Sequence, residues 1–251
     1  MNKNKLQPLY DFLKENREFN KKVQNNFYNS ILSHHEDNSD KVIALLYHIA
    51  NTQSQPKIDY LAAFYKSILN ETNSTKSFAA FVKKVSGKDS ILYIDLFEGL
   101  RKQKGWGNKT AALFVKSVYD AHNGNYDENY SFWSDAPKDI AKEDELKLPV
   151  DAVIMCIFKE IGLSKPYFLE INSILSVHYN GDEIEVWDDL WFWGFITQKG
   201  SGTNRSIEWN ENKYWSLQNT DKNKLEIEKI KGKATKFINL LNTLNNNKIE
   251  E

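Results

Sequence analysis

The sequence predicts an all-α protein made of two helical subdomains with a cleft between them. Apolar residues recur at three- and four-residue spacings through most of the 251 residues, which is the period of an amphipathic helix. Short breaks that contain Gly, Asn or Pro separate these stretches, and short connections are typical of antiparallel helices. The exception is the segment 195–209, which surrounds K-G-S-G-T-N and is expected to form a small β-hairpin.

Each expected helix has an apolar stripe and a boundary signal. The segment 38–40 (N-S-D) precedes one stripe as a cap, and Pro56 marks a break. Pro149 precedes a helix that ends at Gly162 and is apolar nearly all round, so it is expected to be central. The expected helices cover residues 6–15, 19–32, 42–49, 58–69, 78–85, 91–102, 110–121, 152–161, 167–177 and 225–244.

Motifs divide the chain into three expected parts. Residues 1–90 form an N-terminal helical part, and residues 166–251 form a C-terminal helical part that closes the cleft. Residues 91–165 form a core between them, which contains an acidic, irregular insertion at 123–147.

Charge is distributed unevenly along the chain, although the formal net charge is only −1. Residues 76–116 contain nine Lys or Arg and three acids, a balance of +6 (9 − 3). Residues 120–151 contain nine acids and three lysines, a balance of −6 (3 − 9). A local basic stretch is suited to phosphate contact, and a solvated helix face is the alternative explanation.

Several protein classes are excluded by composition. The single cysteine, Cys156, rules out an internal disulfide and a four-cysteine iron–sulfur cluster. The five histidines show no metal-ligand spacing, so we expect neither a metal nor a cofactor. No apolar run reaches the length of a membrane span, and the N-terminus has no apolar signal core. These features predict a cytoplasmic protein.

The stretch L-R-K-Q-K-G-W-G-N-K-T, residues 100–110, joins two expected helices through two glycines. Gly105 and Gly107 permit a sharp turn and the close approach of another molecule. Backbone amides at the start of the following helix are natural donors to a phosphate, and Trp106 is expected to pack inward. A plain helix–turn–helix that happens to contain two glycines is the alternative.

The run G-W-G-N-K-T-A-A-L-F-V, followed later by L-P-V-D, resembles two elements of the HhH-GPD superfamily of DNA glycosylases. These elements are the helix–hairpin–helix and the aspartate that opens a later helix, and the resemblance covers about residues 100–158. It implies an all-α enzyme that binds damaged double-stranded DNA. The residues that it places at the DNA are Gly105, Trp106, Gly107, Asn108 and Thr110.

The resemblance also implies the chemistry. Lys109 matches the lysine of bifunctional members, whose neutral amine attacks C1′ of the flipped nucleotide and forms a Schiff base before β-elimination. Asp151 matches the family aspartate, which stabilises the developing sugar cation and helps to deprotonate the amine. Each residue alone also has an ordinary role available, a phosphate or solvent contact for Lys109 and a helix N-cap for Asp151.

The sequence departs from the family pattern at three points, which limits the members of the superfamily that it resembles. The separation of Lys109 and Asp151 is 42 residues (151 − 109), longer than is usual, and the insertion accounts for the difference. Lys104 stands where the family often has proline. The cysteine cluster of endonuclease III types is absent, which favours the cluster-free 8-oxoguanine enzymes, including the archaeal type.

The resemblance to the archaeal type also suggests where a flipped base is held. Those enzymes read and stack the base with an Asp and a Trp four residues apart on a late helix, a spacing shared by Asp189 and Trp193. Trp187 and Trp191 share the adjacent face, and Trp133 and Leu113 are further candidates for the base pocket. Packing between subdomains is the alternative role for the tryptophans.

The sequence therefore predicts a monomeric DNA glycosylase with AP-lyase activity that excises an oxidised purine, 8-oxoguanine. One alternative is a glycosylase of the same superfamily that is monofunctional, against which Lys109 argues, or that acts on another damaged base. The other is a non-catalytic helix–hairpin–helix module that only binds DNA. Such a module would have no use for Asp151.

Overall fold

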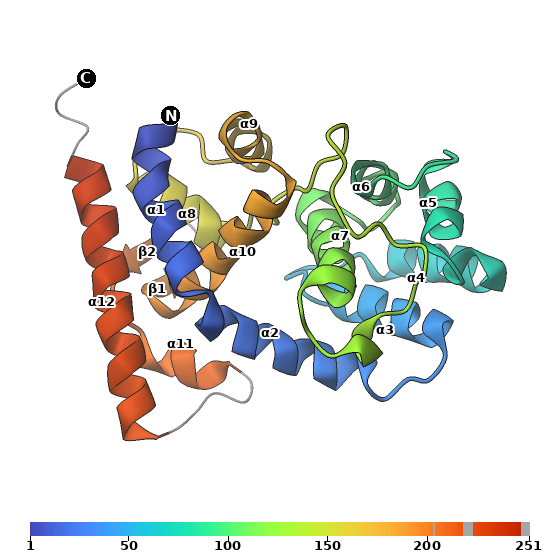
Figure 1. Ribbon diagram of the computed structural model, residues 1–251, viewed down its shortest axis with the longest axis horizontal. Helices are drawn as coiled ribbons and strands as arrows, with labels where there is room; N and C mark the ends of the chain where they lie inside the picture. Colours follow the sequence, from blue (N-terminus) through green and yellow to red (C-terminus); the bar gives the residue numbers. More distant parts are fainter. Residues whose placement is uncertain (203, 218–222, 247–251) are drawn as a thin grey trace. The chain divides into compact units, whose positions relative to one another are not determined.

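The computed structural model describes residues 1–202, 204–217 and 223–246 (Figure 1). Within these residues it contains twelve α-helices, two short 3-10 helices and one two-stranded antiparallel hairpin, which confirms the mostly helical fold. No helix of this described part is long and apolar enough to cross a membrane.

The chain forms two compact units. Unit 1 combines residues 1–26 with residues 150–251, and unit 2 comprises residues 27–149. This division follows spatial contacts, whereas the three parts expected from the sequence follow motifs along the chain. The acidic insertion and the 100–110 stretch both fall in unit 2, while Asp151 falls in unit 1.

The first half of the chain is helical up to the acidic segment. Its elements are α1 (Lys3–Glu15), α2 (Arg17–Leu32), α3 (Asn38–Ala50), α4 (Ile58–Leu69), η1 (Thr72–Thr75), α5 (Phe78–Ser86), α6 (Tyr93–Arg101), α7 (Asn108–Asn123) and η2 (Glu128–Tyr130).

The second half contains five helices and the hairpin. Its elements are α8 (Ala152–Glu160), α9 (Phe168–His178), α10 (Gly181–Ile196), β1 (Gln198–Ser201), β2 (Asn204–Ile207), α11 (Glu211–Ser216) and α12 (Lys224–Asn246).

Local sequence signals account for several helix ends. Asp37 caps α3 by accepting hydrogen bonds from two backbone amides, one residue before the cap expected from N-S-D. Asn180 and Glu183 form a capping box at the start of α10. Gly87 ends α5 with a φ of +76°, a left-handed conformation that glycine adopts without strain.

Unit 1 is organised around α10, which packs against α1, α8, α11 and α12. Trp187 and Trp193 of this helix are completely buried. The Trp193 ring contacts Phe12 of α1 and Phe237 of α12, with ring centroids 5.1 and 6.3 Å away. Burial of such large aromatic surfaces makes α10 the core of this unit. The expectation that the helix after Pro149 is central holds for one face of α8 only, because Met155 and Cys156 on its other face are half-buried.

The expected hairpin is confirmed and lies in unit 1. The strand register pairs Gln198 with Ile207 and Ser201 with Asn204. Gly200 has a φ of +85°, and a Cβ atom there would lie 2.1 Å from the Asn204 carbonyl oxygen, so this turn requires glycine. Residue 203, which is part of the expected turn, lies outside the described residues. The short helix α11 that follows has too few residues to show an apolar period, and the sequence did not predict it.

Unit 2 is built from α3, α5, α6 and α7, and the acidic segment is an integral part of it. Phe132 and Trp133 of this segment are 2% exposed and pack in the core. The Asp135 carboxylate accepts hydrogen bonds from the Phe78 and Ala79 amides at the start of α5. An acid at a helix N-terminus satisfies free amides and complements the helix dipole. The segment expected as an inserted loop therefore holds neighbouring helices in place.

Asp144 repeats this arrangement at α6. Its two carboxylate oxygens each accept a hydrogen bond of 2.8 Å, from the Tyr93 and Ile94 amides. We expect Asp144→Ala to lower the free energy of unfolding by about 1–2 kcal/mol, because it leaves two buried donors unpaired. Amide hydrogen exchange in α6 and urea denaturation measure the effect. Asp139→Ala, an exposed acid in the same segment, is the control, and equal stability of the two variants would contradict the capping role.

His122 gives unit 2 a defined dependence on pH. Burial lowers the pKa of this imidazole to about 4, an effect that Asp135 opposes and Lys41 reinforces. As the pH decreases below about 6.5, this imidazole becomes protonated in the unfolded chain and stays neutral in the folded chain until about pH 4. The free energy of unfolding therefore falls as the pH decreases from about 6.5 towards 4. Between pH 7 and pH 5 we expect a loss of about 1–2 kcal/mol that His122→Phe does not show. Urea denaturation of both proteins at these pH values tests this, and parallel losses would contradict it.

Candidate functional site

The connection 102–107 between α6 and α7 is a tight turn centred on Gly105. This glycine has a φ of +88°, and a Cβ atom there would lie 3.0 to 3.2 Å from atoms of Leu61. Gln53 donates a hydrogen bond of 3.1 Å to the Gly105 carbonyl oxygen. Both the conformation and the close packing thus require glycine at this position.

Gly107 has a different role from Gly105. It is the N-cap of α7 with extended backbone angles, and nothing lies within 4 Å of where its Cβ atom would be. Trp106 between them packs inward as predicted, with its ring 5.3 Å from that of Phe64 and 6.1 Å from that of Phe114. No side chain caps the first turn of α7, so its amides are available to an anion.

Lys109 lies in this first turn of α7. It is half-buried, as is Asn108 before it, whereas Thr110 is only 3% exposed. Leu113, one helical turn after Lys109, is also half-buried. The structure thus places Asn108, Lys109 and Leu113 where a ligand can reach them and uses Thr110 in packing.

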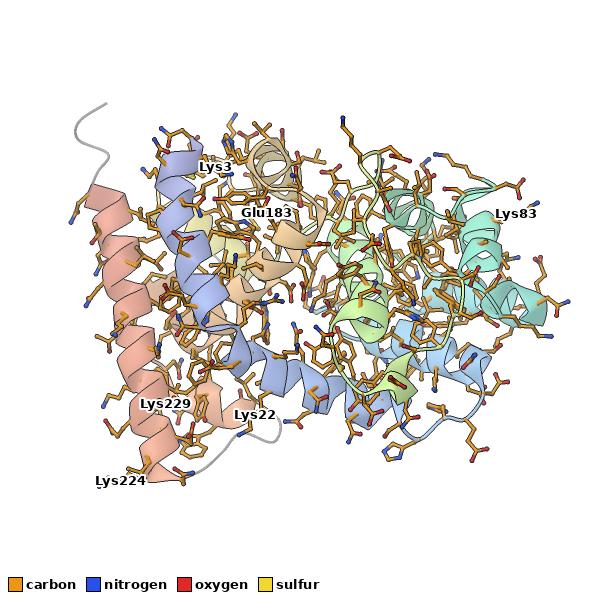
Figure 2. All side chains as sticks on the ribbon, in the orientation of Figure 1. Lys3, Lys22, Lys83, Glu183, Lys224 and Lys229 are labelled. Carbon is orange, nitrogen blue, oxygen red and sulfur yellow. The ribbon has the colours of Figure 1, made fainter. Side chains whose placement is uncertain are left out.

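Ion pairing separates the cations of the basic stretch 76–116 into two groups. Four of the nine, those at positions 76, 102, 104 and 109, form no ion pair with a described carboxylate, and three of these four flank the Gly105 turn. The remaining five have carboxylate partners within unit 2: Lys83, Lys84, Lys88, Arg101 and Lys116. Of these, Lys83 is labelled in Figure 2.

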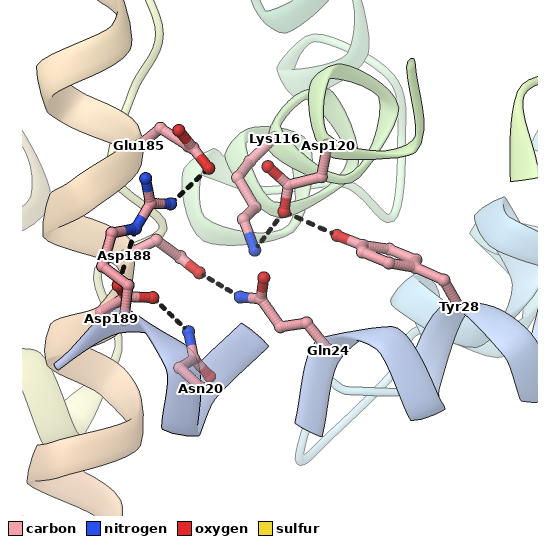
Figure 3. Close-up of polar contacts among 9 residues, drawn as sticks. Asn20, Gln24, Tyr28, Lys116, Asp120, Glu185, Asp188 and Asp189 are labelled. Carbon is pink, nitrogen blue, oxygen red and sulfur yellow. Dashed lines mark hydrogen bonds and ion pairs between the residues drawn. The ribbon is translucent and has the colours of Figure 1, made fainter. Parts of the chain in front are cut away.

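Lys116 is the one member of that stretch that is buried with its partner. Its amine lies 2.8 Å from the Asp120 carboxylate, which also accepts a hydrogen bond of 2.9 Å from the Tyr28 hydroxyl (Figure 3). Burial, followed by the charge of Asp120, raises the pKa of Tyr28 well above its usual value. This charge serves the interior of unit 2 and is not part of a DNA-binding surface.

Asp151 is the N-cap of α8, and both of its carboxylate oxygens are engaged. Oδ1 accepts hydrogen bonds from the Val153 amide at 2.9 Å and the Ile154 amide at 3.1 Å. Oδ2 accepts one from the indole nitrogen of Trp191 on α10, at 3.1 Å. The Asp151 side chain is nevertheless only half-buried. The cap role is therefore real, and it leaves a fixed carboxylate accessible to a ligand.

An aromatic pair and a lysine accompany Asp151 in unit 1. The rings of Trp191 and Phe195 are stacked at 4.9 Å with an interplanar angle of 15°, and both residues are half-buried. The Lys213 amine lies 5.1 Å from the centroid of the Phe195 ring. We call these four residues, Asp151, Trp191, Phe195 and Lys213, the Asp151 cluster.

The pKa of Lys213 depends on burial and on neighbouring charges. Burial, followed by the charge of Arg205, lowers the pKa of Lys213, whereas Asp151 and Cys156 act in the opposite direction. Sequence reasoning missed Phe195 and Lys213. The four-residue spacing of Trp191 and Phe195 was a detectable signal for the pair, but nothing local connects Lys213 to Asp151.

The structure uses Asp189 and Trp193 in packing. The Asp189 carboxylate accepts hydrogen bonds from Arg17 at 3.1 Å and Asn20 at 2.6 Å, and the neighbouring Asp188 accepts one from Gln24 (Figure 3). Trp193 is 0% exposed, so neither face of its ring is available to a base. These contacts join the start of α2 to α10 within unit 1.

Trp133 is also a packing residue. Its indole nitrogen donates a hydrogen bond of 2.8 Å to the Thr75 carbonyl oxygen, and its ring lies among those of Phe78, Phe81 and Phe132. It belongs to the core of unit 2, so the structure brings none of Trp133, Asp189 and Trp193 to a surface where a base could stack.

No group of three or more His, Cys, Asp or Glu side chains that could hold a metal ion occurs in the described ranges. No protein-family model, curated protein sequence or solved structure is significantly similar to the chain. The site is therefore defined by its own residues alone.

The two tryptophans of α10 should respond differently to substitution. Trp193→Ala is expected to lower the free energy of unfolding by about 3–5 kcal/mol, because it empties a fully buried position. Trp191→Phe keeps the aromatic stack and removes one hydrogen bond to Asp151, so we expect a loss of only about 1 kcal/mol. Urea denaturation followed by circular dichroism compares them, and a larger effect of Trp191→Phe would show that the assignment of core and surface is reversed.

Proposed function

We propose that this protein is a bifunctional DNA glycosylase and AP lyase that removes an oxidised purine, 8-oxoguanine, from duplex DNA. The observation that carries the proposal is the Asp151 cluster. It combines a carboxylate held by three hydrogen bonds with a half-buried aromatic pair beside it. Base excision needs a fixed negative charge at the sugar and a surface on which an extruded base can stack.

In this proposal Asp151 acts on the sugar. As the bond between C1′ and the base breaks, positive charge develops on C1′ and the ring oxygen, and the carboxylate stabilises it. The base leaves with the electron pair of that bond and takes up a proton. Because hydrogen bonds fix Asp151 before the DNA arrives, little reorganisation is needed at the moment of reaction.

Lys109 supplies the amine. Its neutral form attacks C1′ and loses a proton. The bond between C1′ and the ring oxygen then breaks, the oxygen takes up a proton, and a Schiff base remains on the opened sugar. Loss of a proton from C2′ then expels the 3′ phosphate, which cuts the strand. Its place in the first turn of α7, where it is half-buried and forms no ion pair with a described carboxylate, supports the assignment.

The α6–α7 connection supports DNA binding as a helix–hairpin–helix. Gly105 and Gly107 allow the backbone to approach a strand, and the uncapped amides of α7 can donate to a phosphate. Lys102 and Lys104, which form no ion pair with a described carboxylate, add positive charge to the same turn.

We assign base stacking to Trp191 and Phe195 in place of Trp193 and Trp133. The first two are half-buried and adjoin Asp151, whereas the other two are buried in cores. This assignment does not distinguish 8-oxoguanine from another damaged base of similar shape, so a glycosylase of different lesion specificity is the nearest alternative.

A DNA-binding module without catalysis is the second candidate. It is favoured by the hydrogen bonds of Asp151, which are those of an ordinary N-cap. Substituting this residue separates the two functions, because Asn caps a helix as well as Asp but has no charge.

Trapping with borohydride tests the proposal. Wild-type protein incubated with a duplex containing 8-oxoguanine should form a covalent adduct that is lost in Lys109→Gln and retained in Lys138→Gln, an exposed lysine of unit 2. Asp151→Asn should reduce base excision by 100-fold or more, on the order of removing one electrostatic group from a transition state, and should leave DNA affinity unchanged. Because Asn keeps the cap and cannot accept from the Trp191 indole, we expect it to lower the free energy of unfolding by about 1 kcal/mol. Absence of an adduct with every oxidised base tried would refute the proposal.

A further inference from the structure

Two cations of unit 1 have no described carboxylate partner although both are half-buried. Arg205 on β2 donates to the Gly202 carbonyl oxygen at 3.0 Å and to the Gln198 side-chain oxygen at 3.3 Å, which are both neutral acceptors. Lys213 on α11 contacts the face of Phe195. In the part of the chain that the structure describes, neither side chain forms an ion pair.

A network of hydrogen bonds fixes the segments that carry these cations. The Asn210 side chain caps α11 at the Lys213 amide and also donates to the Gln198 carbonyl oxygen of β1 at 3.0 Å. The Gln198 side chain in turn donates to the Val153 carbonyl oxygen of α8, at 3.0 Å. The hairpin, α11 and α8 are therefore tied together, so Arg205 and Lys213 are held near each other before any ligand binds.

The charge of Arg205 acts on Lys213. Arg205 is the second cause, after burial, of the lowered pKa of Lys213. Asp151 and Cys156 act in the opposite direction but do not reverse the shift, and burial raises the pKa of the Cys156 thiol. Holding two cations together in a half-buried place has an electrostatic cost that an anion would offset.

Space for an anion exists beside Arg205. A cavity of about 640 Å³ is bounded by Arg205, Gly202 and one face of α8, on which Ala152, Cys156, Lys159 and Glu160 lie. The Glu160 carboxylate accepts a hydrogen bond of 3.0 Å from the Asn245 side chain. Ala152 directly follows Asp151, so this opening begins at the end of α8 that carries the candidate catalytic carboxylate.

We propose that Arg205 and Lys213 form a phosphate-binding site. Resting on the proposed function, we infer that the phosphate is a phosphodiester of the DNA strand that presents the damaged nucleotide to Asp151. The guanidinium can bind two phosphate oxygens with parallel hydrogen bonds, and the ammonium adds a point charge that can reorient. The site thereby fixes the strand next to the cluster that stacks the base.

The salt dependence of DNA binding tests the site. For the double variant Arg205→Gln/Lys213→Gln, the slope of log affinity against log salt concentration should become smaller by about 0.9, because one phosphate contact is lost. Each single variant should weaken binding at low salt. Lys231→Gln, an exposed lysine of α12 in the same unit, is the matched control and should leave the slope unchanged. Circular dichroism establishes that all variants fold.

Titration with inorganic phosphate separates the site from the proposed function. Binding of phosphate to the wild type and not to the double variant, observed by NMR of the backbone amides of β2 and α11, supports the site even if trapping shows no glycosylase. A double variant that keeps the wild-type salt slope and the wild-type phosphate binding overturns the site. If that variant still forms the adduct, the proposed function stands. Phosphate binding that the double variant loses, with an unchanged DNA slope, would assign the site to free phosphate and overturn its role on DNA.

Discussion

The hydrogen bonds of the Asp151 carboxylate are the constraint on which the candidate site depends. One oxygen holds the first turn of α8, and the other holds the indole of Trp191 on α10. A single side chain thereby fixes the relative positions of a helix start and an aromatic pair. Because α10 is also the most buried helix of unit 1, the pair rests on a rigid support. The Asp151 carboxylate thus has a structural role and a proposed chemical role that do not compete.

Acidic side chains have a second structural use in unit 2. The segment 123–147 carries most of the negative charge between Asp120 and Asp151, and its Asp135 and Asp144 cap α5 and α6. Part of the excess of acids in this part of the sequence therefore caps helix termini, and the buried charge of Asp120 pairs with Lys116. Net charge along a sequence reports on a surface only after such internal partners are known.

The sequence predicted those features that local patterns determine. Helical periods, the hairpin, the Gly105 turn and the inward packing of Trp106 follow from neighbouring residues, and the structure contains all of them. The site was harder to predict from the sequence, because α10 is apolar on most of its circumference and its sequence does not show which tryptophan faces outward. Lys213 lies 62 residues after Asp151 (213 − 151), and only tertiary structure brings it to the cluster.

Unit 1 is discontinuous in the chain, and this has a consequence for its biosynthesis. Residues 1–26 are made first, yet their partners α8, α10 and α12 follow only after residue 150. The apolar faces of α1 and of the start of α2 therefore remain without their native cover while the whole of unit 2 is translated, and such exposed apolar surface is prone to aggregation. Closing a loop of this length slows assembly more than it lowers stability, since the entropic cost grows only with the logarithm of loop length.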